Sequence, residues 1–298
     1  MRHPFVGLDA RLRSVQRGYT GETLALFAAL GFTVVLVGWL LGQWAGVVIA
    51  LAVAFLTTQV LANLDTRQLM RMQGGVPLAT WQAPGLHRLL ATLTRRAELP
   101  ATPQLYLLPG GVPNAFTVGE DDHAAIGVSR GLIGELGRRE LEGVLAHELG
   151  HLQAGDTKVM RIAGSLVHTT RTVGQVGLIT CALAALFGEP IPLVLPLLFF
   201  AAPSVALALQ LWLSRRREFA ADAAAVALTG DASGLASALV RLDRWRSRLR
   251  YLGYALGTPP TWLSSHPPTR ERLERLQELQ PQAFLPAAPR RSIWTWAL

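Results

Sequence analysis

The chain has 298 residues, of which half are hydrophobic and only 16% are charged, and its formal net charge is +8. Soluble globular proteins carry roughly 25% charged residues, so the composition excludes intrinsic disorder and argues against an ordinary soluble enzyme. The single cysteine, Cys181, excludes an intrachain disulfide and a cysteine-rich metal site. The excess of positive charge lies in residues 1–21 and 214–298, next to apolar stretches, as is typical of membrane proteins.

The first predicted elements are a basic segment over residues 1–22 and a long apolar run after it. No charged residue occurs between positions 22 and 65, and these 42 residues would extend about 63 Å as one helix, roughly twice the hydrocarbon thickness of a bilayer. The run therefore predicts a transmembrane hairpin over residues 23–62 that turns at Gly42-Gln43. The alternative is a buried hairpin of a soluble protein, but soluble helices of this length show a polar face.

A second pair of apolar stretches predicts another transmembrane hairpin, over residues 162–213, with its turn at Glu189. Its first helix is expected to enter the membrane near Thr172, where Arg171 can extend its charged end to the surface. Lysine and arginine flank the outer ends of both hairpins, and neither turn contains any. Both chain termini and both long polar segments are therefore expected on the cytoplasmic side of a membrane.

The two polar segments, residues 63–161 and 214–280, are predicted to form helices and a few short strands, and residues 281–298 a tail. Amphipathic spacing of leucines predicts the helices, and short apolar runs between glycine and proline turns predict the strands. The expected strands are Gln104–Leu108, Ala115–Val118 and Ala124–Val128, and the expected helices are Ala83–Glu98, a short helix from Arg130 capped by Ser129, Arg139–Ala154, Arg216–Leu228, Ser233–Leu249 and one that starts at Pro267-Pro268.

The sequence His147-Glu148-Leu149-Gly150-His151 lies within the predicted helix Arg139–Ala154. A spacing of four residues puts both imidazoles on one helical face, one turn apart. Two neutral ring nitrogens so placed can bind one Zn²⁺, and Glu148 between them can reach a water on the metal. The simpler alternative is a helix with two histidines that make ordinary hydrogen bonds.

A catalytic zinc site needs a third protein ligand and an open coordination position. Cysteine is almost absent, so a carboxylate or another histidine must serve, and Glu218 after the fourth apolar stretch is the best candidate. Asp222, one turn further, can accept a hydrogen bond from the far nitrogen of a ligand histidine. Alone, this pair of carboxylates would be read as solvated residues that pair with nearby arginines, but the preceding H-E-x-x-H favours a metal site.

Three motifs, in this order along the chain, resemble those of the M48 metallopeptidases: H-E-L-G-H, R-R-R-E-F-A-A-D and S-S-H-P-P-T-R-E-R-L. Within that family the sequence most resembles the bacterial membrane-integrated heat-shock proteases of the HtpX type, which are related to the CAAX prenyl proteases. The resemblance extends roughly from Ala83 to Leu276. It includes Val112-Pro113-Asn114-Ala115-Phe116-Thr117, which resembles the strand of the family that lies on the substrate side.

The resemblance implies a mainly α (α+β) multi-pass membrane protein with a gluzincin-type peptidase domain and a small antiparallel sheet. Residues 63–161 and 214–280 would form the two parts of this domain, which would bind one zinc ion per chain. The implied zinc ligands are His147, His151 and Glu218, with Glu148 as the base, Asp222 behind a ligand histidine, His266 as the residue that stabilises the oxyanion, and Asn114 and Ala115 on an edge strand that pairs with an extended peptide.

The function that the resemblance implies is a zinc-dependent endopeptidase that hydrolyses membrane or misfolded proteins at the cytoplasmic face of a prokaryotic inner (plasma) membrane. Its expected partners are polypeptide substrates and the lipid bilayer, and no nucleic acid. The first alternative is a catalytically inactive membrane scaffold stabilised by zinc, although the intact Glu148 argues against it. The second is a basic protein that binds nucleic acid through arginines 241–250, but this run is better explained by anionic lipid headgroups or a solvated face.

Overall fold

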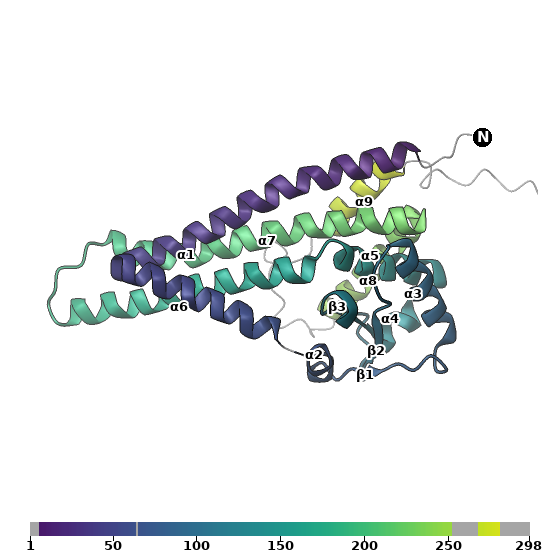
Figure 1. Cartoon of the computed structure of the whole chain (residues 1–298), viewed down its shortest axis with the longest axis horizontal. Coiled ribbons are helices and arrows are strands. Elements are labelled where there is room, and N and C mark those ends of the chain that lie inside the picture. Colours follow the sequence, from purple (N-terminus) through teal and green to yellow (C-terminus); the bar gives the residue numbers. More distant parts are fainter. Residues whose placement is uncertain (1–5, 64, 252–267, 281–298) are drawn as a thin grey trace, which may run out of the picture.

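The computed structural model describes residues 6–63, 65–251 and 268–280, and the predicted tail 281–298 lies outside them. Three long helices, α1 (Val6–Ala62), α6 (Asp156–Leu186) and α7 (Val194–Thr229), form an elongated bundle. This bundle extends away from a smaller lobe that contains the sheet and the shorter helices (Figure 1). The protein is therefore mainly helical, as the sequence predicts.

Helix α1 folds back on itself where the backbone leaves the helical conformation, at Gly42 and Gln43. Gln43 has a φ of 49°, in the left-handed region that most residues avoid. The two arms approach so closely that a Cβ atom on Gly46 would lie 2.1 Å from the carbonyl oxygen of Gly38. The predicted turn is therefore confirmed, and glycine is required where the arms meet.

Helices α6 and α7 form a second hairpin, but each continues well beyond the predicted apolar stretch. Helix α6 begins at Asp156, after Gly155 with a φ of 65°, so it starts well before Thr172, and the entry into the membrane near Thr172 stays a prediction. Helix α7 is unbroken from Val194 to Thr229, so the prediction of a separate helix over 216–228 is wrong. No glycine or proline occurs between 204 and 229, and arginine is a good helix former, so nothing interrupts the helix where the charged residues begin.

Two helices in the described ranges are long and apolar enough to cross a membrane, namely Gly21–Val60 within α1 and Val194–Thr229, which is α7. Helix α6 contacts both of them extensively. Small hydroxyl side chains join α1 to α6: Ser165 Oγ lies 2.9 Å from Thr57 Oγ1 and 2.6 Å from Thr58 Oγ1. Such polar contacts are common between helices packed in lipid. The predicted number of membrane spans remains a prediction.

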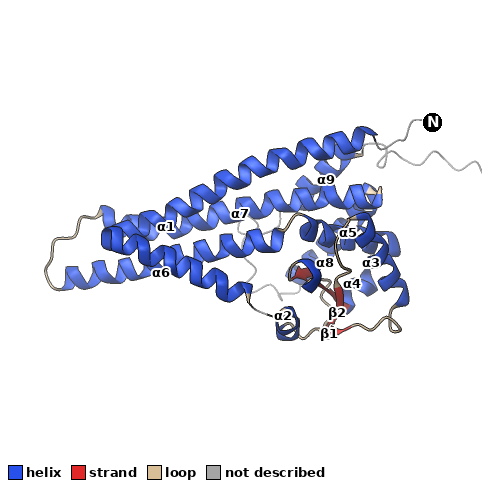
Figure 2. Ribbon diagram, viewed as in Figure 1, coloured by secondary structure: helices blue, strands red, loops and turns tan. Residues whose placement is uncertain are grey.

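The strands form one small sheet in the lobe (Figure 2). The sheet is mixed and not antiparallel throughout, which corrects the expectation from the sequence. Its order is β1 (Val76–Pro77), β2 (Gln104–Leu108), β4 (Ala125–Ser129) and β3 (Ala115–Val118). Strand β4 pairs antiparallel with β3 and parallel with β2. The reason is that the chain returns from β3 into the space between β2 and β3, so that β4 runs in the same direction as β2. This order leaves β3 at the edge.

Helix α5 (Arg138–Gln153) lies at the centre of the lobe, and its buried residues include Leu145 and Leu149. The core around it is formed by buried aliphatic residues of the sheet and of the surrounding helices. Glycines allow close approach of α5 to its neighbours: a Cβ on Gly150 would lie 3.0 Å from the Cβ of Ala224 on α7. The remaining helices are α2 (Thr66–Met72), α3 (Pro84–Arg96), η1 (Asp121–His123), α4 (Arg130–Glu135), α8 (Ala232–Tyr251) and α9 (Thr269–Leu279).

Candidate metal centre

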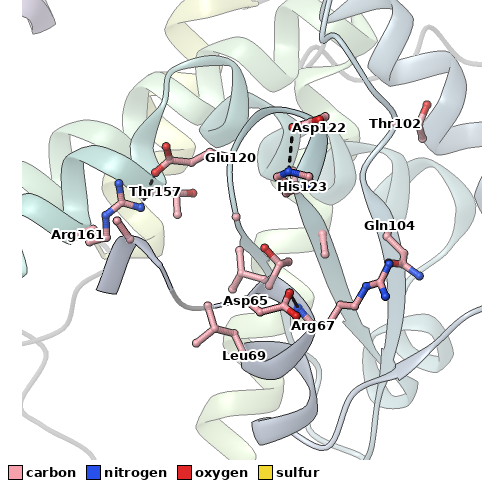
Figure 3. Close-up of a pocket in the computed structure, with 16 residues that line it drawn as sticks. Asp65, Arg67, Leu69, Thr102, Gln104, Glu120, Asp122, His123, Thr157 and Arg161 are labelled. Atoms are coloured by element: carbon pink, nitrogen blue, oxygen red, sulfur yellow. Dashed lines mark hydrogen bonds and ion pairs between the residues drawn. The ribbon is translucent and has the colours of Figure 1, made fainter. Parts of the chain in front are cut away.

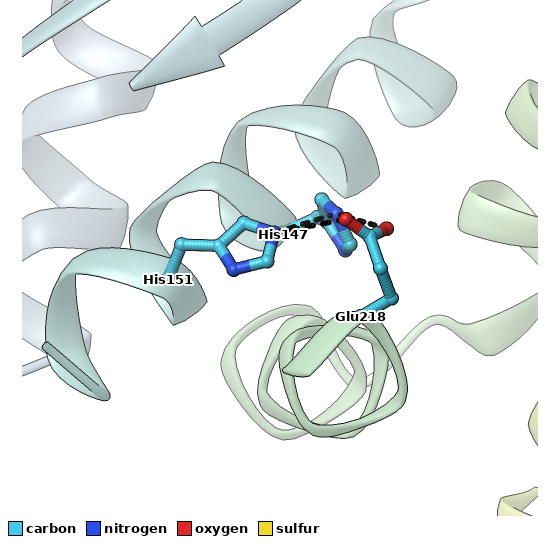
Figure 4. Close-up of side chains that lie close together, drawn as sticks. All are labelled: His147, His151 and Glu218. Carbon is cyan, nitrogen blue, oxygen red and sulfur yellow. Dashed lines mark hydrogen bonds and ion pairs between the residues drawn. The ribbon is translucent and has the colours of Figure 1, made fainter. Parts of the chain in front are cut away.

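The close packing of α5 on α7 brings two histidines and one glutamate together. His147 and His151 point from α5 towards Glu218 on α7, and one ligand atom of each lies within 4.8 Å of the others (Figure 4). The Nε2 atoms of the two histidines are 3.2 Å apart. The Glu218 oxygens lie 3.5 Å from His147 Nε2 and 3.7 Å from His151 Nε2. Three side chains that the sequence places far apart or one turn apart therefore converge on one point.

These separations fit a divalent ion of the size of zinc. Ligand atoms at the usual 2.0–2.1 Å from a tetrahedral zinc ion lie roughly 3.3–3.4 Å from one another. The separations in the structure lie on both sides of this value: 3.2 Å between the two Nε2 atoms, 3.5 Å from His147 Nε2 to Glu218 Oε2 and 3.7 Å from His151 Nε2 to Glu218 Oε1. Two imidazoles and a carboxylate are also a donor set that zinc accepts. The residues present thus fit the implied metal in both chemistry and spacing.

The far nitrogen of His147 is held by a carboxylate. Asp222 Oδ1 lies 3.0 Å from His147 Nδ1, and Asp222 is itself bound by Arg272 of α9. A neutral imidazole carries one proton, and an acceptor at Nδ1 keeps that proton there. The lone pair of Nε2 is then directed at the point shared with His151 and Glu218. Asp222 therefore lies where the sequence predicts a supporting carboxylate.

His151 has the same kind of partner, which the sequence reasoning missed. Asp156 Oδ2, at the start of α6, lies 2.7 Å from His151 Nδ1. Arg217 of α7 in turn pairs with Asp156 Oδ1 at 2.9 Å. Each ligand histidine is thus joined to an aspartate, and each aspartate to an arginine.

The electrostatics of the cluster favour positive charge between its carboxylates. Burial of the imidazole works against its protonated form, but hydrogen bonds with Asp222 and Glu218 outweigh burial and raise the pKa of His147 to about 10. Side chains that stabilise a proton on His147 this strongly are rich in negative charge. A divalent cation bound there would be stabilised by the same carboxylates, Asp222 and Glu218.

Glu148, the predicted base, is buried beside the cluster and is oriented by the edge strand. Thr117 of β3 donates a hydrogen bond from Oγ1 to Glu148 Oε2 at 2.8 Å. A hydrogen bond from a hydroxyl to a carboxylate fixes the direction of the carboxylate oxygens. The sequence predicts a strand at Thr117, and its spacing from Glu148 gave no indication of this contact.

A small hollow of about 80 Å³ lies next to His147 and Glu148, and Asn114 and Ala115 are among the residues that line it. Its other walls are mixed: Leu132, Val144, Leu235, Leu239 and Leu242 are aliphatic, whereas Asp243, Arg246, Thr269 and Arg272 are polar or charged. The two predicted substrate-side residues therefore line a mixed hollow beside the predicted base.

A larger cavity of about 650 Å³ lies away from the metal cluster, between the end of α1, the start of α6 and the turn after β3 (Figure 3). Arg161 and Glu120 form an ion pair at 2.6 Å at its edge. Val118 contributes to its wall, and Ala115 at the other end of β3 lines the small hollow. Strand β3 thus runs from one cavity to the other, past Glu148.

The structure places most of the predicted site residues together, and it shows three partners that the sequence reasoning missed. His266 lies outside the described residues. The three missed partners, Asp156, Thr117 and Arg272, each had a weak signal: the first follows His151 by five positions, and the other two lie within segments that carry the family resemblance. The contacts of Thr117 and Arg272 join elements that are distant in the sequence, and that of Asp156 depends on the direction in which α6 leaves α5, so spacing alone could not reveal them.

Comparison with known proteins matches residues 80–280 to peptidase family M48. A protease HtpX homolog of Acidiphilium cryptum is 36% identical, over 87% of this chain and 96% of that one. Another from Acaryochloris marina is 37% identical, over 82% and 88%. The crystal structure of Ste24p from S. mikatae aligns with a TM-score of 0.49 and 20% identity, over 88% of this chain and 66% of that one, just under two thirds of its length.

Proposed function

Because the chain belongs to peptidase family M48, we propose that it is a membrane-integrated zinc endopeptidase that cleaves membrane or misfolded proteins at the cytoplasmic face. The observation that carries the proposal is the convergence of His147, His151 and Glu218, with Glu148 buried at their side. Membership of the family supports the proposed reaction class, and the convergence of these side chains supports an active site at this position.

His147, His151 and Glu218 would hold one zinc ion in a gluzincin-type site, and Asp222 would support His147 from behind. When bound, zinc supplies Lewis acidity, which polarises a carbonyl and lowers the pKa of a water molecule. Three protein ligands would leave the fourth position of a tetrahedral zinc ion for a substrate or a water.

Glu148 would act as the general base, taking a proton from the attacking water and passing it to the leaving amine. The hydrogen bond from Thr117 leaves one Glu148 oxygen, Oε1, for this task. Strand β3 lies at the sheet edge, so an extended peptide can pair with it near Asn114 and Ala115. His266 would stabilise the oxyanion.

Membrane insertion through four spans, two in α1 and one each in α6 and α7, is part of the proposal. The apolar windows of α1 and α7 support it, as do the arginines that flank them. The arginines at positions 215–217 follow the apolar part of α7 directly and precede Glu218. This order supports a position of the His147, His151 and Glu218 cluster close to the membrane surface, on the side rich in positive charge, which would be the cytoplasmic side of a prokaryotic inner membrane.

The decisive experiment compares the full-length protein with Glu148→Gln in detergent. We expect about one zinc ion per chain in both, and a loss of casein cleavage of about 10²–10⁴-fold in the variant, because only the base is removed. Glu142→Gln is the matched control, on the same helix outside the cluster, and it should keep full activity. Equal cleavage by wild type and Glu148→Gln contradicts the proposal, and zinc binding without any cleavage by the wild type favours the inactive scaffold.

A further inference from the structure

Asp156 is a buried carboxylate that connects three helices at the edge of the metal cluster. It is the first residue of α6, and only 4% of its surface is exposed. One oxygen lies 2.7 Å from His151 Nδ1 on α5, and the other lies 2.9 Å from Arg217 on α7. Both oxygens thus have charged or polar partners, in a place where an unpaired carboxylate would be costly.

The arrangement repeats, with other residues, what Asp222 does for His147. There the carboxylate lies between His147 Nδ1 and the guanidinium of Arg272. A carboxylate at the far nitrogen keeps the proton on Nδ1, fixes the plane of the ring and makes Nε2 a stronger donor to a metal. Two copies of the same arrangement, on two ligands of one cluster, point to the same purpose in both.

We propose that Asp156 is a positioning residue for His151, and that Arg217 keeps Asp156 in place. This inference rests on the proposed metal site. As a consequence, both helices of the second hairpin position the ligands: α6 through Asp156, and α7 through Glu218 and Asp222.

A purely structural role for Asp156 makes a different prediction. An acidic residue in the first turn of a helix stabilises the helix dipole, which affects folding but not metal affinity. Asp231 provides the comparison, because it precedes α8 and pairs with Arg139 at 2.8 Å, and its other bonds are to Ser233 and Gly234. A substitution at Asp231 removes the same kind of charge from a helix start without changing a histidine partner.

The test measures zinc dissociation constants of the full-length protein in detergent by competition with a chelator. Asp156→Asn should weaken zinc binding about 10–100-fold, the usual effect of removing such a partner, and Asp231→Asn should leave it unchanged. The absorption spectrum of the cobalt-loaded protein should shift in Asp156→Asn only. Zinc binding by Asp156→Asn within twofold of wild type overturns the inference. Absence of zinc binding by the wild type overturns the proposed function, and this inference with it.

Arg217 is tested by a double-mutant cycle. Arg217→Gln should weaken zinc binding less than Asp156→Asn, and the double variant should bind no more weakly than Asp156→Asn alone, because Arg217 acts through Asp156. Losses that multiply in the double variant overturn the role of Arg217. If Asp156→Asn does not fold, Arg217→Gln carries the test, since it leaves the carboxylate in place: weaker zinc binding supports the inference and unchanged binding overturns it.

Discussion

Arg272 on α9 grips Asp222 on α7 through two parallel bonds, from Nη2 to Oδ1 at 2.6 Å and from Nε to Oδ2 at 2.8 Å. The same guanidinium lies 3.5 Å from Glu218 Oε2, and Arg272 is 7% exposed. One buried positive charge therefore faces two buried carboxylates. Helix α9 lies far after α7 in the sequence, and Arg272 joins it to the cluster of His147, His151 and Glu218.

Removal of this charge should destabilise the protein strongly. Arg272→Met removes the guanidinium that faces two buried carboxylates and leaves them with their histidine contacts; breaking a buried ion pair typically costs about 3–5 kcal/mol in the free energy of unfolding. The measurement is thermal unfolding in detergent with a chelator present, so that no metal replaces the lost charge. Arg270→Met is the control, because Arg270 is exposed on the same helix and pairs only at the surface with Glu274. Equal stability of the two variants would refute this account.

The hydrogen bond from Thr117 to Glu148 should matter for turnover and not for metal binding. Thr117→Val keeps the shape of the side chain and removes the donor at 2.8 Å from the Glu148 carboxylate. We expect kcat to fall about 10-fold with zinc affinity unchanged, because a hydrogen bond to a charged group is worth about 1.5–3 kcal/mol. Thr92→Val, at a half-buried position of α3, serves as the control, because it also removes a hydroxyl group but one that bonds only the Arg88 carbonyl in the described structure. A kcat equal to that of wild type would show that Thr117 does not orient the base.

Glu140, at the start of helix α5, should make the free energy of unfolding depend on pH in the acidic range. Burial raises the pKa of Glu140, but Ser237, the Gly137 amide and Arg241 outweigh it, so the net pKa lies below the ordinary 4.5. A depressed pKa contributes stability above the unfolded value, and this contribution is lost as the pH falls through the folded pKa.

Glu140→Gln should therefore cost about 1 kcal/mol at neutral pH, and the difference from wild type should shrink as the pH falls below about 4.5. Melting temperatures of both proteins between pH 7 and pH 3 provide the measurement. Glutamine keeps the size of the side chain but replaces one of two accepting oxygens with an NH2 group, so the charge is reported by the change of the difference with pH and not by its size. A gap in melting temperature that stays constant across this range would contradict the assigned role of the carboxylate.

The turn of α1 should tolerate no side chain at Gly46. In Gly46→Ala the new methyl group would overlap the Gly38 carbonyl, so the arms must separate. Overpacking of this kind typically lowers the free energy of unfolding by about 1–3 kcal/mol. Gly31→Ala is the matched control on the same helix, since a Cβ there meets open space. Resistance to thermal unfolding in detergent should fall in Gly46→Ala and not in Gly31→Ala, and the opposite order would be incompatible with the contact described.

Local patterns predicted much of this protein, and long-range contacts explain what they missed. Strands Gln104–Leu108 and Ala115–Val118 have the predicted bounds, because strand length is set by turns that are visible nearby. The convergence of Glu218 on the two histidines was predicted from motif order and from the resemblance. The order of the sheet and the continuity of α7 were not predicted, since the first depends on tertiary packing and the second on the absence of a helix-breaking residue where the composition changes.

The partners of the histidines show the same limit at the level of single side chains. His151 and Asp156 are close in the sequence, but the contact depends on Gly155, whose left-handed conformation starts a new helix at that point. Arg272 lies 50 residues from Asp222 and reaches it only because α9 packs on α7. Neither contact follows from periodicity, because each requires the direction in which one helix leaves another.

Because α7 is unbroken, it holds Glu218 at a fixed distance from the apolar part of the same helix. Glu218 follows Leu213, near the end of the uncharged stretch, by five residues, about 7.5 Å along a helical axis. With α7 anchored in a bilayer, the distance of Glu218 from the membrane surface would be fixed, because the rise per residue of an α-helix is nearly constant. Under the proposed function, a polypeptide with an unfolded stretch just above the membrane would therefore reach the level of Glu218, whereas one folded down to the lipid would not.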